Sequence, residues 1–134
     1  MPELNNPFSL RVYWEDTDAG GVVFYANYLK FFERARTEWL RSKGIQQSLL
    51  EQEYGCIFVV TDAQISYLAP ARLDDLLVVS AKVKSHGKAS MEIEQQVWRE
   101  QTLLARGLVR VGCVNARSMR PQRIPDHLLP LLAS

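Results

Sequence analysis

The sequence predicts an α+β protein in which a mainly antiparallel sheet wraps around one long central helix. Three observations lead to this prediction: one strand-like run at 8–14, one long helix-like run at 26–43, and four later strand-like runs that follow one another. Helix-length segments do not alternate with those strands, so a parallel βαβ sheet is disfavoured. The apolar side of the helix and the inner face of the sheet would bury each other, which places the helix at the centre.

The first strand is expected at 8–14, where apolar and polar residues alternate. The apolar residues stand at every second position, which places them on one face of a strand: Phe8, Leu10, Val12 and Trp14. The pattern breaks at 17–21, where Asp, Ala and two glycines are typical turn residues. A tight turn is therefore predicted between this strand and the helix.

The central helix is expected at 26–43, where the apolar period becomes helical. One apolar stripe has the spacing i, i+4, i+7, i+11 and consists of Tyr28, Phe32, Ala35 and Trp39. Charged residues at helical spacing occupy the other faces. Gly44 is expected to end the helix, and the stripe is the predicted centre of the core.

The remainder of the chain is predicted to be mostly strand. A short helix is expected at 45–54, ended by Gly55, and strands are expected at 57–67, 76–84, 89–99 and 103–114, which are rich in Val, Ile and aromatic residues. The segment from Pro121 onward contains three prolines. It is expected to be a loop with a short terminal helix.

Length and composition favour one globular domain over residues 1–134. The chain is 47% hydrophobic and 23% charged, which is ordinary for such a domain. A formal net charge of +1 disfavours a nucleic-acid-binding protein, which normally has a strong basic excess. The sequence has neither a secretory signal pattern nor an apolar run of membrane-spanning length. A cytoplasmic protein is expected, with Cys56 and Cys113 as reduced thiols or, alternatively, as a disulfide.

The most informative segment is 11–32, RVYWEDTDAGGVVFYANYLKFF, which places one carboxylate on the predicted turn. Its order is Arg-Val, four residues, Thr-Asp, two residues, Gly-Val-Val, and then Ala26, Tyr28 and Phe32. This order resembles the active-site signature of hotdog-fold thioesterases of the 4-hydroxybenzoyl-CoA thioesterase type. The segments 33–41 and 67–75 are similar to the Tol-Pal-associated acyl-CoA thioesterases of that family. The resemblance covers nearly the whole chain and implies the hotdog fold.

Asp18 is the first candidate catalytic residue. From its neighbours alone it is explained as a turn former, because an Asp before Ala-Gly-Gly stabilises a turn through its own backbone. The resemblance instead implies that Asp18 is a nucleophile or general base in thioester hydrolysis. Either role suits a carboxylate, since the reaction needs a group that attacks the carbonyl carbon or activates a water.

Asp16 stands two residues before Asp18, and this pair raises the alternative of a magnesium site, because carboxylates suit that ion. No His or Cys stands nearby to complete such a site. The resemblance implies no metal and no cofactor, since coenzyme A is part of the substrate. Asp16 is therefore expected to support the turn or to face the helix.

The start of the central helix is the expected oxyanion site. A helix N-terminus offers unpaired N–H groups and the positive end of the helix dipole, and such donors stabilise an oxyanion. The resemblance assigns this contact to the backbone N–H of Tyr25. We expect Gly20 and Gly21 to let the substrate approach the main chain, and Gly21 and Val22 are predicted substrate-binding residues. Tyr28 is expected either to line the acyl pocket or to lie in the core.

The segment 84–90, KSHGKAS, is the second candidate cluster. It is either an ordinary solvated hairpin turn or a contact for the phosphates of coenzyme A. Lys and Ser side chains and a backbone loosened by Gly are suitable phosphate donors. Lys88 and Ser90 are the predicted phosphate contacts, with Arg72 and Lys84 as the next candidates.

The sequence as a whole predicts an acyl-CoA thioesterase that releases free acid and CoA. A dimer or tetramer is expected, because one sheet around one helix leaves unpaired sheet edges. Two alternatives stay open: a non-catalytic acyl-binding or scaffold protein of the Tol-Pal system, and a thioesterase that acts on acyl carrier protein. Dehydratase and serine hydrolase chemistry are disfavoured, since no His stands near Asp18 and no GxSxG motif occurs.

Overall fold

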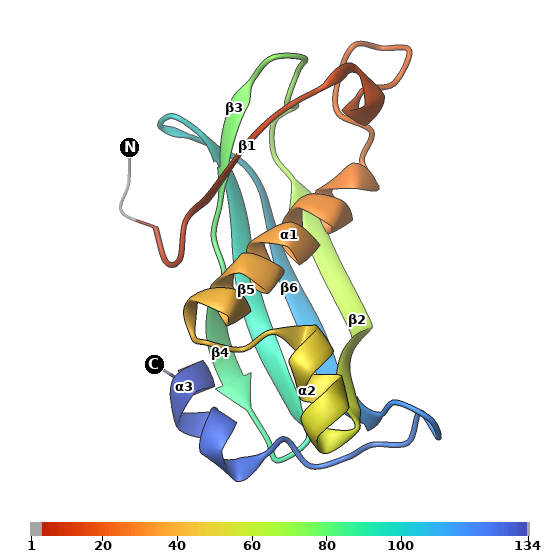
Figure 1. Ribbon diagram of the computed structural model, residues 1–134. Coiled ribbons are helices and arrows are strands. Elements are labelled where there is room, and N and C mark those ends of the chain that lie inside the picture. Colours follow the sequence, from red (N-terminus) through yellow and green to blue (C-terminus); the bar gives the residue numbers. More distant parts are fainter. Residues whose placement is uncertain (1–3, 134) are drawn as a thin grey trace.

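The computed structural model describes residues 4–133 and confirms an antiparallel sheet that curves around one long helix (Figure 1). The strands and helices in chain order are β1 (Phe8–Arg11), α1 (Asn27–Ser42), α2 (Gln47–Tyr54), β2 (Cys56–Tyr67), β3 (Leu76–Val79), β4 (Lys82–His86), β5 (Ser90–Arg99), β6 (Thr102–Asn115) and α3 (Leu129–Ala133). Two 3-10 turns lie at Trp14–Asp16 and Asp126–Leu128.

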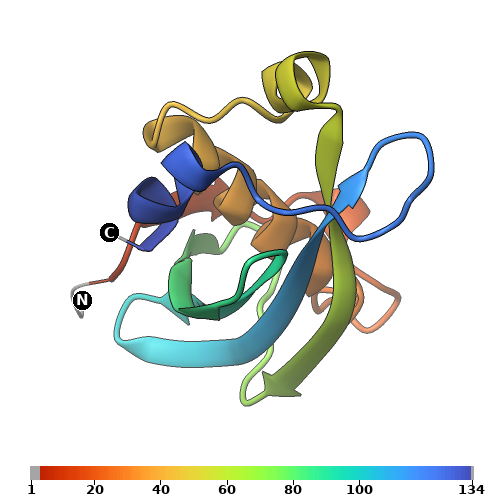
Figure 2. The same ribbon diagram turned by 90° about the horizontal axis from the view of Figure 1, so that it is seen from below.

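The strands form one sheet in the order β1-β3-β5-β6-β2, with β4 also paired to β5. All of these pairs are antiparallel. The longest pairing joins β2 to β6, from Cys56 opposite Asn115 to Tyr67 opposite Ala105. Figure 2 shows the sheet curling around α1. Because β2 is the last strand of this order, one of its edges has no partner strand among the described residues.

The core lies between α1 and the concave face of the sheet. The predicted helical stripe is buried, with Tyr28 and Trp39 each 3% exposed and Phe32 and Ala35 at 0%. The helix approaches β6 so closely that a Cβ on Gly107 would stand 2.5 Å from Phe32 Cε2. A side chain at position 107 would therefore force the Phe32 ring or the backbone to shift.

The helix ends agree with the glycines singled out in the sequence. Gly44 has a φ of +80° and follows the cap of α1, and Gly55 has a φ of +67° and caps α2. Both values lie in the left-handed region that favours glycine at a helix end. The short terminal helix is confirmed as α3.

The first strand is shorter than the alternation predicts. β1 ends at Arg11, and Trp14, expected on the apolar face, belongs to a 3-10 turn and is 79% exposed. The chain turns because the Asp16 carboxylate accepts a hydrogen bond from the Tyr13 N–H at 2.8 Å. This local side-chain bond competes with continued strand pairing.

The strand predicted at 76–84 is two strands, β3 and β4, separated at Ser80 and Ala81. The Ser80 carbonyl accepts from the side-chain amide of the fully buried Gln95 at 3.2 Å, while the Ser80 hydroxyl accepts from the Gln96 N–H at 3.0 Å. The Ser80 hydroxyl thus accepts the bond from the Gln96 N–H that a main-chain carbonyl would accept in a regular strand pair. The strand is interrupted where the buried Gln95 amide finds its hydrogen-bond partner.

Candidate active site

Asp18 lies on a tight turn between β1 and α1 that is closed by main-chain hydrogen bonds. Its N–H donates to the Val22 carbonyl at 2.9 Å, and its carbonyl accepts from the Gly21 N–H at 3.0 Å. Gly21 has a φ of +79°, which a residue with a side chain rarely adopts. The turn predicted from the sequence is therefore present, and its backbone conformation favours glycine at position 21.

The Asp18 carboxylate is exposed. Its Oδ1 accepts a hydrogen bond from the Gly20 N–H at 2.8 Å. Within residues 4–133, no second group donates to this carboxylate. A water molecule or a substrate can therefore reach the remaining lone pairs, as a nucleophile or general base requires.

Asp16 supports the turn, as predicted. The residue is 7% exposed, and its carboxylate bonds to the Tyr13 N–H. Its carbonyl accepts from the Phe24 N–H at 2.9 Å and from the Asn27 side-chain amide at 2.8 Å. Asp16 thus ties the two ends of the turn together. Residues 4–133 contain no group of three or more His, Cys, Asp or Glu side chains arranged to hold a metal ion.

The turn is anchored to the loop between β2 and β3. The Val23 N–H donates to the Ala71 carbonyl at 2.8 Å, and Val22 forms a β-bridge with Arg72. The loop itself is held by Arg99 at the end of β5, whose guanidinium bonds to the Asp75 carboxylate at 2.9 Å. The sheet therefore fixes the position of Asp18 through a short chain of contacts.

Tyr25 lies in the segment between the turn and α1, where the oxyanion donor is expected. Its N–H donates to no group within residues 4–133. α1 begins at Asn27, and its N-cap residue, Ala26, makes no side-chain capping bond. The unpaired Tyr25 N–H lies just before the helix start, beside the positive end of the helix dipole. These are the properties of an oxyanion donor.

Tyr28 belongs to the core of the protomer. Its hydroxyl accepts from the Ala71 N–H at 3.3 Å, and its ring packs edge-on against Phe31 and Tyr67 at centroid distances of 5.8 and 5.2 Å. Burial raises the pKa of the Tyr28 hydroxyl. These contacts account for Tyr28 as a core residue, and a substrate contact by this side chain stays a prediction.

Lys88 and Ser90 do not lie near Asp18 in the protomer. They belong to the turn between β4 and β5 and to the start of β5, whereas the loop that anchors Asp18 contacts Arg99 at the end of β5. Strand β5 rises by about 30 Å between these ends, at roughly 3.3 Å per residue. Figure 1 shows the two turns at opposite ends of the sheet.

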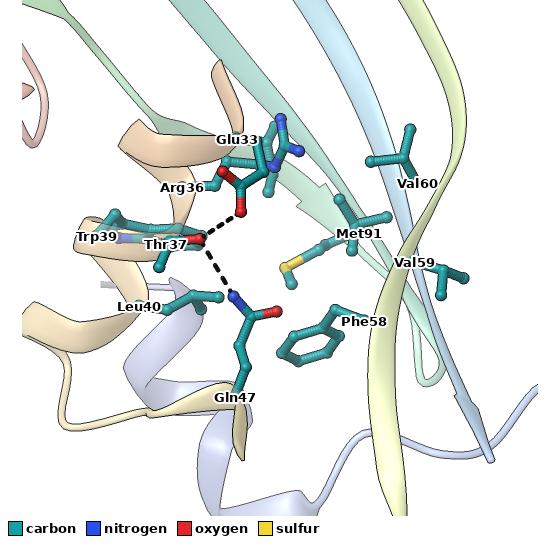
Figure 3. Close-up of a pocket in the computed structure, with 12 residues that line it drawn as sticks. Glu33, Arg36, Thr37, Trp39, Leu40, Gln47, Phe58, Val59, Val60 and Met91 are labelled. Atoms are coloured by element: carbon teal, nitrogen blue, oxygen red, sulfur yellow. Dashed lines mark hydrogen bonds between the residues drawn. The ribbon is translucent and has the colours of Figure 1, made fainter. Parts of the chain in front are cut away.

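A cavity of about 150 Å³ lies between α1, the start of α2 and the strands (Figure 3). Its walls are mainly apolar and include Phe58 and Met91, and its polar side is formed by Glu33, Thr37 and Gln47. The Thr37 hydroxyl donates to the Glu33 carboxylate at 3.1 Å and accepts from the Gln47 amide at 3.3 Å. No residue of the Asp18 turn lines this cavity.

Sequence patterns alone do not identify Tyr67 as a site residue. Its hydroxyl donates to the Tyr25 carbonyl at 2.9 Å across 42 positions of the chain. An aromatic residue at the end of a strand is ordinary in a sequence. The contact between Tyr67 and Tyr25 can be recognised only in the folded structure, where the end of β2 lies beside the start of α1.

The amino-acid sequence matches a known protein family and several known proteins. Residues 20–105 match the model of the Thioesterase superfamily. The acyl-CoA thioesterase YbgC of Haemophilus influenzae is 46% identical over 127 residues, with 93% of each chain covered. The acyl-CoA thioester hydrolase YbgC of Escherichia coli is 43% identical over 121 residues, with 90% of each chain covered.

Solved structures agree with these sequence matches. A probable thioesterase from Bartonella henselae superposes with a TM-score of 0.85 at 34% identity, covering 89% of this chain and 98% of that one. The fold, the exposed carboxylate on the turn and the unpaired N–H before α1 thus occur in a chain whose relatives are thioesterases. The chain belongs to the Thioesterase superfamily and has the hotdog fold of that family.

Proposed function

We propose that this protein hydrolyses acyl-CoA thioesters to free acid and CoA, with Asp18 and the Tyr25 N–H as its catalytic groups. The observation that carries the proposal is the exposed Asp18 carboxylate on a turn that leads directly to the unpaired Tyr25 N–H. The substrate class follows from the relatives, which are named as acyl-CoA thioesterases.

The general-base route uses one water molecule. The Asp18 carboxylate takes a proton from the water while the water oxygen attacks the thioester carbonyl carbon. The carbonyl oxygen becomes negatively charged and accepts a hydrogen bond from the Tyr25 N–H. Collapse of this intermediate breaks the carbon–sulfur bond, and the sulfur of CoA takes the proton that Asp18 holds.

In the nucleophilic route Asp18 attacks the carbonyl carbon itself. The carbon–sulfur bond breaks, CoA leaves, and a mixed anhydride joins the acyl group to Asp18. Water then hydrolyses the anhydride and restores the carboxylate. Both routes need the same exposed carboxylate and the same oxyanion donor, with Gly21 and Val22 letting the thioester approach the turn.

The predicted phosphate contacts require a second copy of the chain. Lys88 and Ser90 lie at the far end of the sheet from Asp18 in the same protomer, so a single CoA molecule bound to all three needs two protomers. The edge of β2 that pairs with no strand among residues 4–133 supports an assembly, because such edges are normally covered. We therefore propose a homo-oligomer, a dimer or tetramer, with the site at a subunit boundary.

The protein is proposed to act in the cytoplasm, where CoA thioesters and reduced thiols occur together. Cys56 and Cys113 are free thiols, which supports a reducing compartment. Among residues 4–133, no helix combines the length and apolar character needed to cross a membrane.

The function is tested by a hydrolysis screen of the purified protein. The panel contains acyl-CoAs with short, medium and long aliphatic chains and with aromatic acyl groups, and the measurement is the release of free thiol. Hydrolysis of at least one acyl-CoA, lost in Asp18→Asn, is the expected result. A folded protein that hydrolyses none of them contradicts the proposal. Binding without turnover would then favour the acyl-binding role, and turnover of acyl carrier protein substrates alone would favour a carrier-protein thioesterase.

A further inference from the structure

We infer that Tyr67 is a positioning residue for catalysis, because its hydroxyl holds the peptide group that follows the proposed oxyanion donor. This inference rests on the proposed function. Tyr67 is the last residue of β2, and its hydroxyl donates to the Tyr25 carbonyl at 2.9 Å. The bond joins the end of the sheet to the start of α1.

The Tyr67 ring is held between two other tyrosines. It packs edge-on against Tyr25 at a centroid distance of 6.3 Å and against Tyr28 at 5.2 Å. Tyr28 is itself fixed, since it is 3% exposed and its hydroxyl accepts from the Ala71 N–H. Edge-on aromatic contacts of this kind favour one side-chain orientation. The Tyr67 hydroxyl is thus directed at the Tyr25 carbonyl by its neighbours.

Two successive peptide groups determine the direction of the Tyr25 N–H. The Phe24 carbonyl, in the same peptide group as that N–H, accepts from the Asn27 N–H at 2.9 Å. The Tyr25 carbonyl, in the next group, accepts from Tyr67 and, at 3.4 Å, from the Tyr28 N–H. The Tyr28 bond is too long to be strong. Without the Tyr67 hydroxyl, the second peptide group would lose its one short hydrogen bond.

The Tyr67 hydroxyl remains a donor over the working range of an enzyme. Burial, followed by the nearby Tyr25, raises the pKa of Tyr67 above its ordinary value of 10.0. The phenol therefore keeps its proton at neutral pH. The hydrogen bond to the Tyr25 carbonyl should therefore persist at neutral pH.

The test is Tyr67→Phe, which removes the hydroxyl and keeps the ring. The matched control is Tyr54→Phe, because Tyr54 is 41% exposed against 46% for Tyr67 and also makes one long-range hydroxyl contact, to His127 at 3.1 Å. Loss of one neutral hydrogen bond should lower kcat about 3- to 10-fold in Tyr67→Phe, with KM within about twofold. The ratio of the variant kcat to the parent kcat should stay constant across the neutral pH range, where the phenol keeps its proton. Tyr54→Phe should keep the parent kcat.

A second measurement does not depend on activity. The amide nitrogen of Ala26 shares a peptide group with the Tyr25 carbonyl, so its NMR chemical shift should change in Tyr67→Phe and stay constant in Tyr54→Phe. An unchanged Ala26 resonance, an unchanged kcat, or a change in KM alone overturns the inference. If the parent hydrolyses no acyl-CoA but the Ala26 resonance moves, the proposed function fails while the structural link stands. If the parent is active and Tyr67→Phe equals it, the inference alone fails.

Discussion

Asp16 and Asp18 stand two positions apart and differ in their surroundings. The Asp16 carboxylate is buried and bonded to the main chain at Tyr13. The Asp18 carboxylate is exposed, with one bond to the Gly20 N–H. Their positions in the sequence make both residues candidates for the site, and the difference in burial distinguishes the two. Of these two carboxylates, Asp18 is the one that is open to solvent.

At the same scale, the two cysteines are predicted to be unreactive in the folded protein. Cys56 is 0% and Cys113 1% exposed, and burial, together with the Cys56 thiol, raises the pKa of Cys113 to about 12. Since the thiolate is the reactive form, a thiol reagent at pH 8 should react slowly with the native protein. It should detect two thiols per chain after unfolding. Rapid reaction of either thiol before unfolding would contradict the burial of this pair.

The raised pKa also has a consequence for stability. The folded state favours the protonated Cys113 thiol, so its contribution is complete below the ordinary pKa of 9.0 and is lost as pH rises toward 12. Near neutral pH the free energy of unfolding should therefore not vary with pH through this group. The thiol-release assay for CoA gains from the same burial, because the enzyme's own thiols add little background.

At the scale of secondary structure, the contact between α1 and β6 depends on Gly107. A Cβ there would stand 2.5 Å from Phe32 Cε2 and 3.0 Å from the Gln64 carbonyl oxygen. Gly107→Ala should lower the free energy of unfolding by about 1–3 kcal/mol through overpacking, measured by denaturant titration. Gly87→Ala is the control, because the nearest atom to a Cβ there is Ser90 Oγ at 3.8 Å. Equal stability of the two variants would rule out the close packing of helix and sheet.

The elements that could be predicted from the sequence are those whose pattern lies within one short segment of the chain. The stripe from Tyr28 to Trp39 has a helical period, and the turn at Asp18 has its own glycines, so both were predictable from the sequence. The break at Ser80 was not, because it depends on Gln95, which is 15 residues away. Trp14 was placed on the wrong face because a side-chain bond between Asp16 and Tyr13 overrides the alternation.

The candidate site was predictable to a similar extent. Asp18 and Tyr25 stand within one segment, so the family signature covers them together. Tyr67 reaches Tyr25 only after β2 has paired with β6. Lys88 lies far from Asp18 because the two residues are near opposite ends of β5. A sequence motif does not show at which end of a strand a residue will lie.

At the scale of the whole molecule, Lys88 should act on an active site that contains the Asp18 of another copy. Lys88→Ala should raise KM and leave kcat nearly unchanged, because a phosphate contact is the same in the ground state and the transition state. The effect should shrink as salt rises, since exposed charges are screened. Lys82→Ala, an exposed lysine on β4, is the control and should keep the parent KM.

Mixing two variants tests whether the site is shared. Subunits of Asp18→Asn and Lys88→Ala, exchanged into mixed oligomers, should recover activity at low substrate above the mean of the separate variants, because some sites then combine two native residues. Light scattering at micromolar protein should give the mass of a dimer or tetramer. A monomer mass, or no recovery on mixing, would exclude a shared site.

The proposed catalytic role of Asp18 is tested by measuring kcat of Asp18→Asn on an acyl-CoA that the parent hydrolyses. Asn keeps the shape and is also a good turn residue, but it cannot attack or accept a proton. We expect kcat to fall by roughly 10² to 10⁴, the usual contribution of a positioned base. KM should change little and the thermal midpoint should be unchanged or higher, and Asp16→Asn should lose far less activity. Near-normal turnover by a folded Asp18→Asn protein would contradict a catalytic role for Asp18 and leave it as a turn residue only.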